Sequence, residues 1–397
     1  MPKWGYKNIK VNRKFHSKMK TLIYISLHDY GRKQEMTFLE RLNEAVDYAI
    51  KTNYVAHERA VNINKSLYAH KNICIFGTGE FFEDCADIEY VQRFEYVGDN
   101  NSDRWGKLFK GRKCLSPNEI AKMEDIAVLI MIGEWRPVYK QLTALGIECY
   151  PMDWYAMNVY DPHYNSEWFI KQRRAILDSA DIFEDEKSKE IYVEAICNRI
   201  APPLAKKIFN ELKTPGEYFS SDVFSMGSEE YFVDAGAYKG DSIDKLLTTT
   251  NGKFGAIYSF ELDSAIFKEL EKTANKYNRE KIFLFNAGVS NKNDEVQYSY
   301  VHGQETHAER ITTLDQALKG KKVTFIKMDV ETFELKALEG ANNIISQQKP
   351  KLSISAYHYL SDLWEVPIMI KKIVPEYKLY LRHHAPTVWD TDCYAYI

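Results

Sequence analysis

The sequence has no apolar run that approaches the roughly 20 residues needed to span a bilayer. It also has no N-terminal apolar core followed by a small-residue cleavage site. Neither charge is in large excess, since 53 Lys and Arg residues stand against 56 Asp and Glu residues. Such a balance gives no global field toward nucleic acid or an acidic membrane. We therefore expect a cytoplasmic protein without a membrane span or a nucleic-acid partner.

Cysteine is sparse and scattered. The six cysteines form no Cys-x-x-Cys pair and have no histidine nearby at the spacing of metal ligands. We expect free, mostly buried thiols and predict no metal site.

Apolar and aromatic residues, by contrast, are plentiful. Hydrophobic residues make up 45% and aromatic residues 14% of the 397 positions. This composition predicts a packed chain, and the length favours two or three domains.

The N-terminal part predicts three units. Residues 1–70 read as a helical segment, in which Phe38, Leu42, Ala45 and Ala49 fall on one stripe. Residues 71–158 predict a small Rossmann-like α/β domain, because apolar strand segments at 72–81, 94–101, 127–133 and 147–153 alternate with turn and helix formers. Residues 159–228 predict a helical connector or lid.

A second alternating pattern fills residues 229–397. Strand segments at 231–236, 256–262, 282–289, 323–330 and 351–357 alternate with helices, and two closing strands follow near 377–381 and 392–397. This predicts a doubly wound, mostly parallel sheet whose ligand lies at the carboxyl ends of the strands.

The turn after the first of these strands has the features of a ligand-binding loop. A carboxylate ends the strand, glycines allow close approach to backbone, and a helix start offers N–H donors to a carboxylate. This suits the methionine end of S-adenosylmethionine. The candidate cofactor-binding residues here are Asp234, Gly236, Ala237, Tyr238 and Gly240.

The next two strand ends predict contacts to the rest of such a cofactor. Glu261, beside Leu262, lies about 20 residues beyond the glycines, where an acidic side chain binds a ribose diol. The alternative is that Glu261 caps the following helix together with Asp263. Asn286 and Ala287 follow the third strand, where an adenine ring would lie, although Asn also favours turns.

Carboxylates and a histidine mark the acceptor side. Asp329 and Glu331 follow an apolar strand, and His358 follows the next one. These candidate catalytic residues could hold a sugar hydroxyl, remove its proton or, for the carboxylates, bind a divalent ion. A hydrogen-bonded structural role for His358 stays open, and Glu334 is expected to cap or solvate its helix.

Five segments resemble motifs of the FkbM-family methyltransferases in order and spacing: "VDAGAYKGDS", "FEL", "NAGVS", "TTLD" and "IKMDVETFELKALEGA". The resemblance covers about 231–359 and implies a class I methyltransferase fold that uses S-adenosylmethionine. It further implies O-methylation, commonly of a sugar or another hydroxylated metabolite. Thr332 and Phe333 stand where the family often has Gly-Ala, which changes the expected shape of the acceptor pocket.

The N-terminal Rossmann-like unit has an incomplete dinucleotide fingerprint. Gly77 and Gly79 supply two of its glycines, but Phe82 replaces the third, and Asp99 ends the next strand. A scaffold role, or a homo-oligomer formed through this unit, is as compatible with the sequence as nucleotide binding.

The leading hypothesis is an S-adenosylmethionine-dependent O-methyltransferase that acts on a hydroxyl of a saccharide or nucleotide-linked sugar, in surface-glycan biosynthesis. One alternative is a non-catalytic S-adenosylmethionine-binding or scaffold protein. The other is an enzyme that binds a nucleotide or nucleotide-sugar through the N-terminal Rossmann-like unit.

Overall fold

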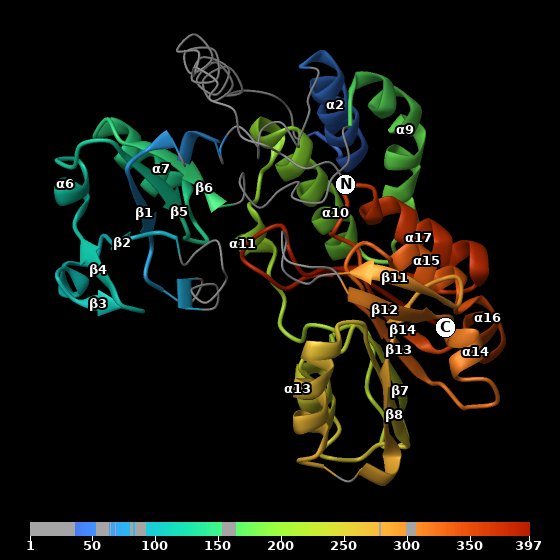
Figure 1. The fold of residues 1–397 in the computed structure, drawn as a ribbon. Coiled ribbons are helices and arrows are strands. Elements are labelled where there is room, and N and C mark those ends of the chain that lie inside the picture. The colour runs from blue at the N-terminus through green and yellow to red at the C-terminus, as the bar shows by residue number, and fades with distance from the viewer. Residues whose placement is uncertain are drawn as a thin grey trace.

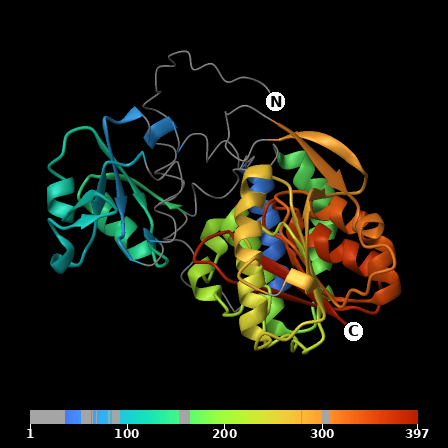
Figure 2. The ribbon, with the colours of Figure 1, turned by 60° about the horizontal axis from the view of Figure 1, so that its bottom comes forward.

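The computed structural model describes residues 36–52, 63, 65–67, 69–79, 82, 83, 93–152, 164–277, 279–298 and 307–397. These residues form two α/β bodies, one around each of two large sheets (Figures 1 and 2). The predicted α/β fold class is confirmed. The boundaries between the four predicted units remain predictions.

The N-terminal body, residues 72–151, is built on a six-stranded sheet of order β3-β4-β2-β1-β5-β6. All neighbouring strands in it are parallel except β3 and β4. The order runs outward from β1 in both directions, so a topological switch point lies between β1 and β5. Its strands are β1 (Asn72–Phe76), β2 (Tyr96–Gly98), β3 (Leu108–Phe109), β4 (Arg112–Leu115), β5 (Ile126–Ile130) and β6 (Glu148–Pro151), and its helices are α6 (Pro117–Ile120) and α7 (Arg136–Ala144).

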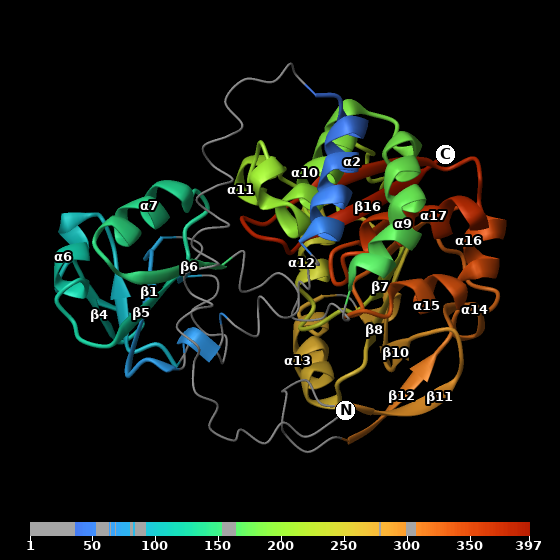
Figure 3. The same cartoon turned by 90° about the horizontal axis from the view of Figure 1, so that it is seen from above.

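The helices that flank this body in sequence pack elsewhere. Helix α2 (Phe38–Lys51) contacts α9 (Ser166–Asp178) and α10 (Glu186–Ile200), and α10 in turn contacts the second large sheet (Figure 3). The predicted stripe of α2 is present, with Leu42, Ala45 and Ala49 fully buried. These segments therefore form a helical layer of the second body.

The C-terminal body, residues 164–397 together with α2, has a seven-stranded sheet of order β15-β16-β14-β13-β7-β8-β9. Only β16 runs antiparallel to its neighbours. The strands are β7 (Tyr231–Ala235), β8 (Ala256–Glu261), β9 (Ile282–Asn286), β13 (Phe325–Met328), β14 (Lys351–Ser355), β15 (Lys378–His383) and β16 (Thr391–Tyr396). The two closing strands are where the sequence predicts them.

Helices connect these strands. They are α11 (Phe209–Leu212), α12 (Asp241–Thr249), α13 (Ser264–Ala274), α14 (Leu314–Ala317), α15 (Glu334–Glu339), α16 (Asn342–Gln348) and α17 (Asp362–Ile373). A small sheet lies at the side of the main sheet and has the order β10-β12-β11. Its strands are β10 (Gly288–Val289), β11 (Asp294–Tyr298) and β12 (His307–Thr312).

Two expectations from composition can be compared with the structure. Cys74, Cys114, Cys149, Cys197 and Cys393 are buried and free, as predicted, while Cys85 lies outside the described residues. Within the described ranges, no helix is both long and apolar enough to cross a membrane.

Candidate functional site

The turn after β7 passes extremely close to the end of β13. Gly236 has a φ of +80°, and a Cβ atom on it would lie 1.7 Å from the Asp329 carbonyl oxygen. Only glycine fits here. The sequence interpretation assigned this missing side chain to ligand approach, whereas the structure gives its space to the Asp329 backbone. The glycine turn and the acceptor-side strand are thus directly in contact.

The same turn continues in unusual backbone conformations. Tyr238 has a φ of +46° and a side chain that is largely accessible, and Gly240 has a φ of +90° at the start of α12. A Cβ atom on Gly240 would lie 2.9 Å from Thr273 Cγ2. Ala237, between them, is buried and donates its N–H to the Phe260 carbonyl.

A buried ion pair supports the turn from below. Lys327 Nζ donates a 2.6 Å hydrogen bond to the Gly236 carbonyl and lies 3.3 Å from Asp234 Oδ1. Beyond this ion pair, the Asp234 carboxylate makes no hydrogen bond to a described residue. Burial raises the pKa of Asp234, which Lys327 only partly offsets. A buried carboxylate with spare acceptor capacity therefore lies at the end of β7.

Glu261 joins the ends of β7 and β8. Its Oε2 accepts from the Tyr238 N–H and its Oε1 from the Asp263 N–H, each at 2.9 Å. Burial raises the pKa of Glu261 to about 7, despite these two hydrogen bonds. The N-cap of α13 is Asp263, which accepts from Ala265 and Ile266 N–H groups. The alternative reading of Glu261 as a helix cap does not describe its contacts.

Asn286, the last residue of β9, connects the end of its strand to the end of β8. Asn286 Nδ2 donates to the carbonyls of Glu261 and Leu262 at 3.0 and 3.2 Å, and its Oδ1 accepts from Ser264. Asn286 is exposed and Ala287 is buried. These contacts fix the three strand ends relative to one another, and a cofactor contact by Asn286 remains a prediction.

On the acceptor side, Asp329 receives contacts from three directions. Tyr218 Oη donates a 2.8 Å hydrogen bond to its Oδ2, and His358 Nε2 lies 3.5 Å from its Oδ1. The Tyr357 hydroxyl also lies 3.5 Å from Oδ1. Burial would raise the pKa of Asp329, but Lys327 and His358 lower it overall. The carboxylate is therefore ionised at neutral pH.

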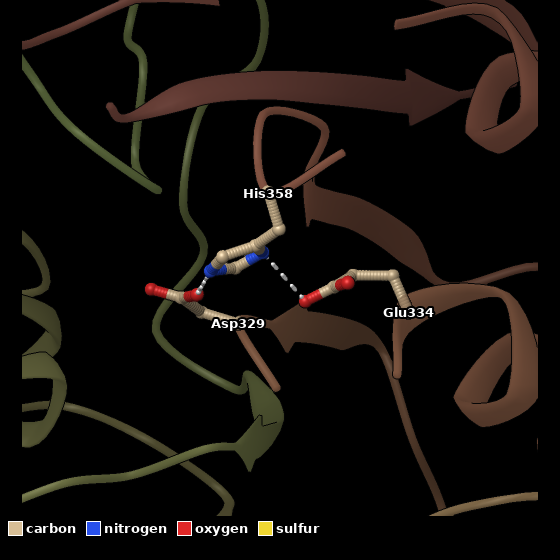
Figure 4. Close-up of side chains that lie close together, drawn as sticks. All are labelled: Asp329, Glu334 and His358. Atoms are coloured by element: carbon tan, nitrogen blue, oxygen red, sulfur yellow. Dashed lines mark ion pairs between the residues drawn. The ribbon is translucent and has the colours of Figure 1, made fainter. Parts of the chain in front are cut away.

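His358 lies between two carboxylates, as Figure 4 shows. Its Nδ1 is 3.1 Å from Glu334 Oε1, and both side chains are 1% exposed. Glu331, which is 56% exposed, approaches His358 Nε2 at 3.5 Å. Burial alone would lower the pKa of His358, but Glu334, Asp329 and Glu331 raise it to about 10. His358 is therefore an imidazolium at neutral pH.

The expectation that Glu334 would cap or solvate its helix is wrong. It is buried, accepts from the Val330 N–H at 2.9 Å and pairs with His358. Its helical position gives no sign of this, because the partner arrives from another strand.

The loop between Asp329 and Glu334 is strained. Glu331 and Thr332 have φ values of +51° and +79°, a conformation that is rare for a β-branched residue such as Thr. Such residues cost on the order of 1–3 kcal/mol each and persist where the surroundings hold them. The segment that departs from the Gly-Ala pair of the family motif is thus held in a glycine-like conformation.

The sequence analysis did not identify two acids near Asp329, namely Asp390 and Asp392. Asp392 is buried on β16 and paired in register with Ser355 of β14. Burial, reinforced by Glu217 and Asp329, raises the pKa of Asp390 to about 7. Tyr218, Lys327 and Glu334 were also missed as site residues. Because β16 runs antiparallel to its neighbours, its amino end lies beside the carboxyl end of β14, and a rule that considers only carboxyl ends of strands does not find these acids.

The donor atoms of Asp329, Glu334 and His358 lie within 4.8 Å of one another, a spacing that a metal ion could use. An imidazolium that lies between two carboxylates and offsets part of their charge accounts for the same arrangement without a metal.

Comparison with known proteins agrees with this geometry. Residues 234–381 match the family model described as the methyltransferase FkbM domain. The matched range begins at Asp234 and includes Glu261, Asp329 and His358. A search of curated proteins gave no match.

Among solved structures, a methyltransferase FkbM from Methylobacillus flagellatus KT is 24% identical, with a TM-score of 0.62. The match covers 89% of this chain and 99% of that one, so the two proteins share their fold over both bodies. A putative methyltransferase from Streptococcus mutans in complex with SAH is 11% identical over 43% of this chain and 90% of that one, with a TM-score of 0.29. The last similarity is too low to support an argument.

Proposed function

From the match of residues 234–381 to the family model described as the methyltransferase FkbM domain, we propose that the chain transfers a methyl group to a hydroxyl of a saccharide or nucleotide-linked sugar. The methyl donor of this class is S-adenosylmethionine. The observation that carries the proposal is the ionised Asp329 carboxylate, which lies beside the glycine turn and between Tyr218 and His358.

The residues around the glycine turn fit the donor. Asp234 is a buried carboxylate with unused acceptor capacity, which suits the ammonium of a methionine end. Glu261 uses one lone pair on each oxygen for backbone N–H groups, so its remaining lone pairs can accept from a ribose diol. Asn286, Leu262 and Ala287 complete the proposed adenosyl side.

The donor supplies an electrophilic methyl group on a sulfonium, so the protein's remaining tasks are alignment and proton removal. Asp329 accepts a hydrogen bond from the acceptor hydroxyl and takes its proton as the oxygen–methyl bond forms and the methyl–sulfur bond breaks. Tyr218 and His358 hold the carboxylate in place. The accessible Glu331 contacts a further hydroxyl of the acceptor.

His358 therefore has a different role from the one first predicted. A group with a pKa of about 10 is already protonated at neutral pH and cannot accept the hydroxyl proton. We assign proton acceptance to Asp329, and to His358 the positioning of that carboxylate and the balance of its charge.

A sugar acceptor is supported by the side chains that surround Asp329. The partly exposed Tyr357 offers an aromatic face and a hydroxyl, and Glu331 and Asp390 offer carboxyl groups, the mixture that binds polyhydroxylated rings. Surface-glycan biosynthesis in the cytoplasm is the setting that this acceptor suggests. A homo-oligomer through the N-terminal body, where Trp105 and Leu108 are exposed, is part of the same proposal.

Methyl transfer from labelled S-adenosylmethionine to a panel of free sugars and nucleotide-linked sugars tests the proposal. We expect incorporation with at least one hydroxylated acceptor, and its loss in Glu261→Ala together with the loss of donor binding. Donor binding without transfer to any acceptor would favour the non-catalytic alternative.

A further inference from the structure

The N-terminal body has a cavity that methyl transfer does not use. It has a volume of about 410 Å³ and is lined by the turn after β1, the ends of β2 and β5, and three residues of the C-terminal body. It lies at the switch point between β1 and β5, the place where open parallel sheets bind ligands. Its volume falls in the range of small-molecule sites.

The floor of the cavity is bare backbone. Gly77 has a φ of +118°, and a Cβ atom on it would lie 2.5 Å from the Met131 carbonyl oxygen. Gly79 differs, because a Cβ atom there would meet no atom of a described residue within 4 Å. Gly77 is therefore required by the fold, whereas Gly79 leaves open space above the turn.

A fixed polar network forms one wall. Asp99 Oδ2 accepts from the Thr78 N–H at 3.0 Å and from the Thr78 hydroxyl at 2.6 Å. Arg104 donates to both Thr78 Oγ1 and Asp99 Oδ2, at 2.7 and 3.1 Å. These contacts hold one guanidinium and one carboxylate side by side at the edge of the cavity.

The opposite wall comes from the C-terminal body, where α11 faces the N-terminal sheet (Figures 1 and 3). The Asn210 side chain packs on Gly133, since a Cβ atom on that glycine would lie 2.5 Å from Asn210 Cγ. Lys213 also lines the cavity and makes no ion pair with a described residue. Two cations, Arg104 and Lys213, and two acids, Asp99 and Glu134, thus line a cavity floored by glycine backbone.

We propose that this cavity binds a nucleoside diphosphate group, of the kind that dinucleotides and nucleotide-linked sugars share. The glycine turn, Arg104 and Lys213 suit the diphosphate, and the Asp99 carboxylate at the end of β2 suits a ribose hydroxyl. Met131 and Ile132 supply apolar lining for a base.

The missing third glycine does not close the site. Phe82, which replaces it, is fully buried in the hydrophobic core and is not one of the cavity-lining residues. The core therefore accommodates the side chain that stands in place of the third glycine.

Calorimetric titration of the full chain with UDP, ADP and inorganic phosphate tests the proposal. Saturating S-adenosylhomocysteine is present throughout, so that an adenine nucleotide cannot enter the donor site. We expect a nucleotide to bind, and binding to weaken roughly tenfold in Lys213→Ala. Gly79→Leu fills the open space and should abolish binding, whereas Lys107→Ala, an exposed lysine of the same body, should leave it unchanged.

The proposal is overturned if neither nucleotide binds, if Gly79→Leu binds as the wild type does, or if inorganic phosphate binds as tightly as the nucleotides. Stabilisation of Gly79→Leu by S-adenosylhomocysteine verifies that this variant is folded. Failure here leaves methyl transfer intact, and Glu261→Ala tests the donor site separately.

Discussion

The hydroxyl of Tyr218 donates a hydrogen bond of 2.8 Å to Oδ2 of Asp329, a residue 111 positions further along the chain. Tyr218 precedes the matched methyltransferase domain, and its backbone has a φ of +63°. A residue in a costly backbone conformation thus holds the proposed proton acceptor from outside the family motif.

Tyr218→Phe tests this contact. Removing the hydroxyl leaves the Asp329 carboxylate without one of its hydrogen bonds and therefore less firmly oriented. We expect kcat to fall roughly tenfold while the Kd for S-adenosylhomocysteine stays unchanged. Tyr380→Phe is the matched control, because its hydroxyl contacts only Tyr396 among described side chains. Equal kcat values in the two variants would remove Tyr218 from the site.

Gly236→Ala should destabilise the protein more than Gly252→Ala. Both glycines have positive φ, +80° and +75°, so each substitution costs about 1–2 kcal/mol in backbone strain. A Cβ atom on Gly236 would also meet a backbone oxygen, at 1.7 Å, whereas one on Gly252 would meet no atom of the described part of the chain within 4 Å. We expect a loss above about 3 kcal/mol for Gly236→Ala in urea unfolding. Equal losses of unfolding free energy in the two variants would contradict this expectation and show that the backbone around Gly236 can move to accept a Cβ atom.

The ion pairs of His358 predict a pH dependence of stability. Its folded pKa of about 10 lies above the unfolded value near 6.5, so its stabilisation is complete below pH 6.5 and is lost as pH rises toward 10. The difference in unfolding free energy between wild type and His358→Gln should shrink across this window. A difference that stays constant, or grows, would mean that His358 is neutral in the folded protein.

Treatment with a chelator distinguishes a protonated His358 from a metal ion bound at the same site. Because the His358 imidazolium already lies between Asp329 and Glu334 and pairs with both, we expect EDTA treatment to leave the rate of methyl transfer unchanged. A loss of activity that Mg²⁺ or Mn²⁺ restores would instead identify Asp329, Glu334 and His358 as metal ligands.

The sequence predicts best those features that repeat along the chain. Apolar strands, turns and helices recur with regular periods, and the carboxyl ends of parallel strands meet at one edge, which brings the regions of Asp234, Glu261 and Asp329 together. Strands β11 and β12 escaped prediction because "DEVQY" has only a short apolar alternation and "HAERIT" has none. Tyr218 and Glu334 escaped because their partners come from distant segments, and no local period encodes a tertiary contact.

The predicted connector shows the same limit. Its helices have clear periodic signals, but the packing of α10 against α2 includes a buried ion pair between Arg41 and Glu194, 2.8 Å apart. Neither charge has a recognisable partner in the linear sequence.

The most direct test of methyl transfer through Asp329 is the turnover of Asp329→Asn, measured beside its affinity for S-adenosylhomocysteine. An amide keeps the shape and can still accept from Tyr218, but it cannot take a proton. The account predicts a fall in kcat of about 10²–10⁴-fold with donor affinity unchanged. Turnover equal to that of the wild type would contradict it.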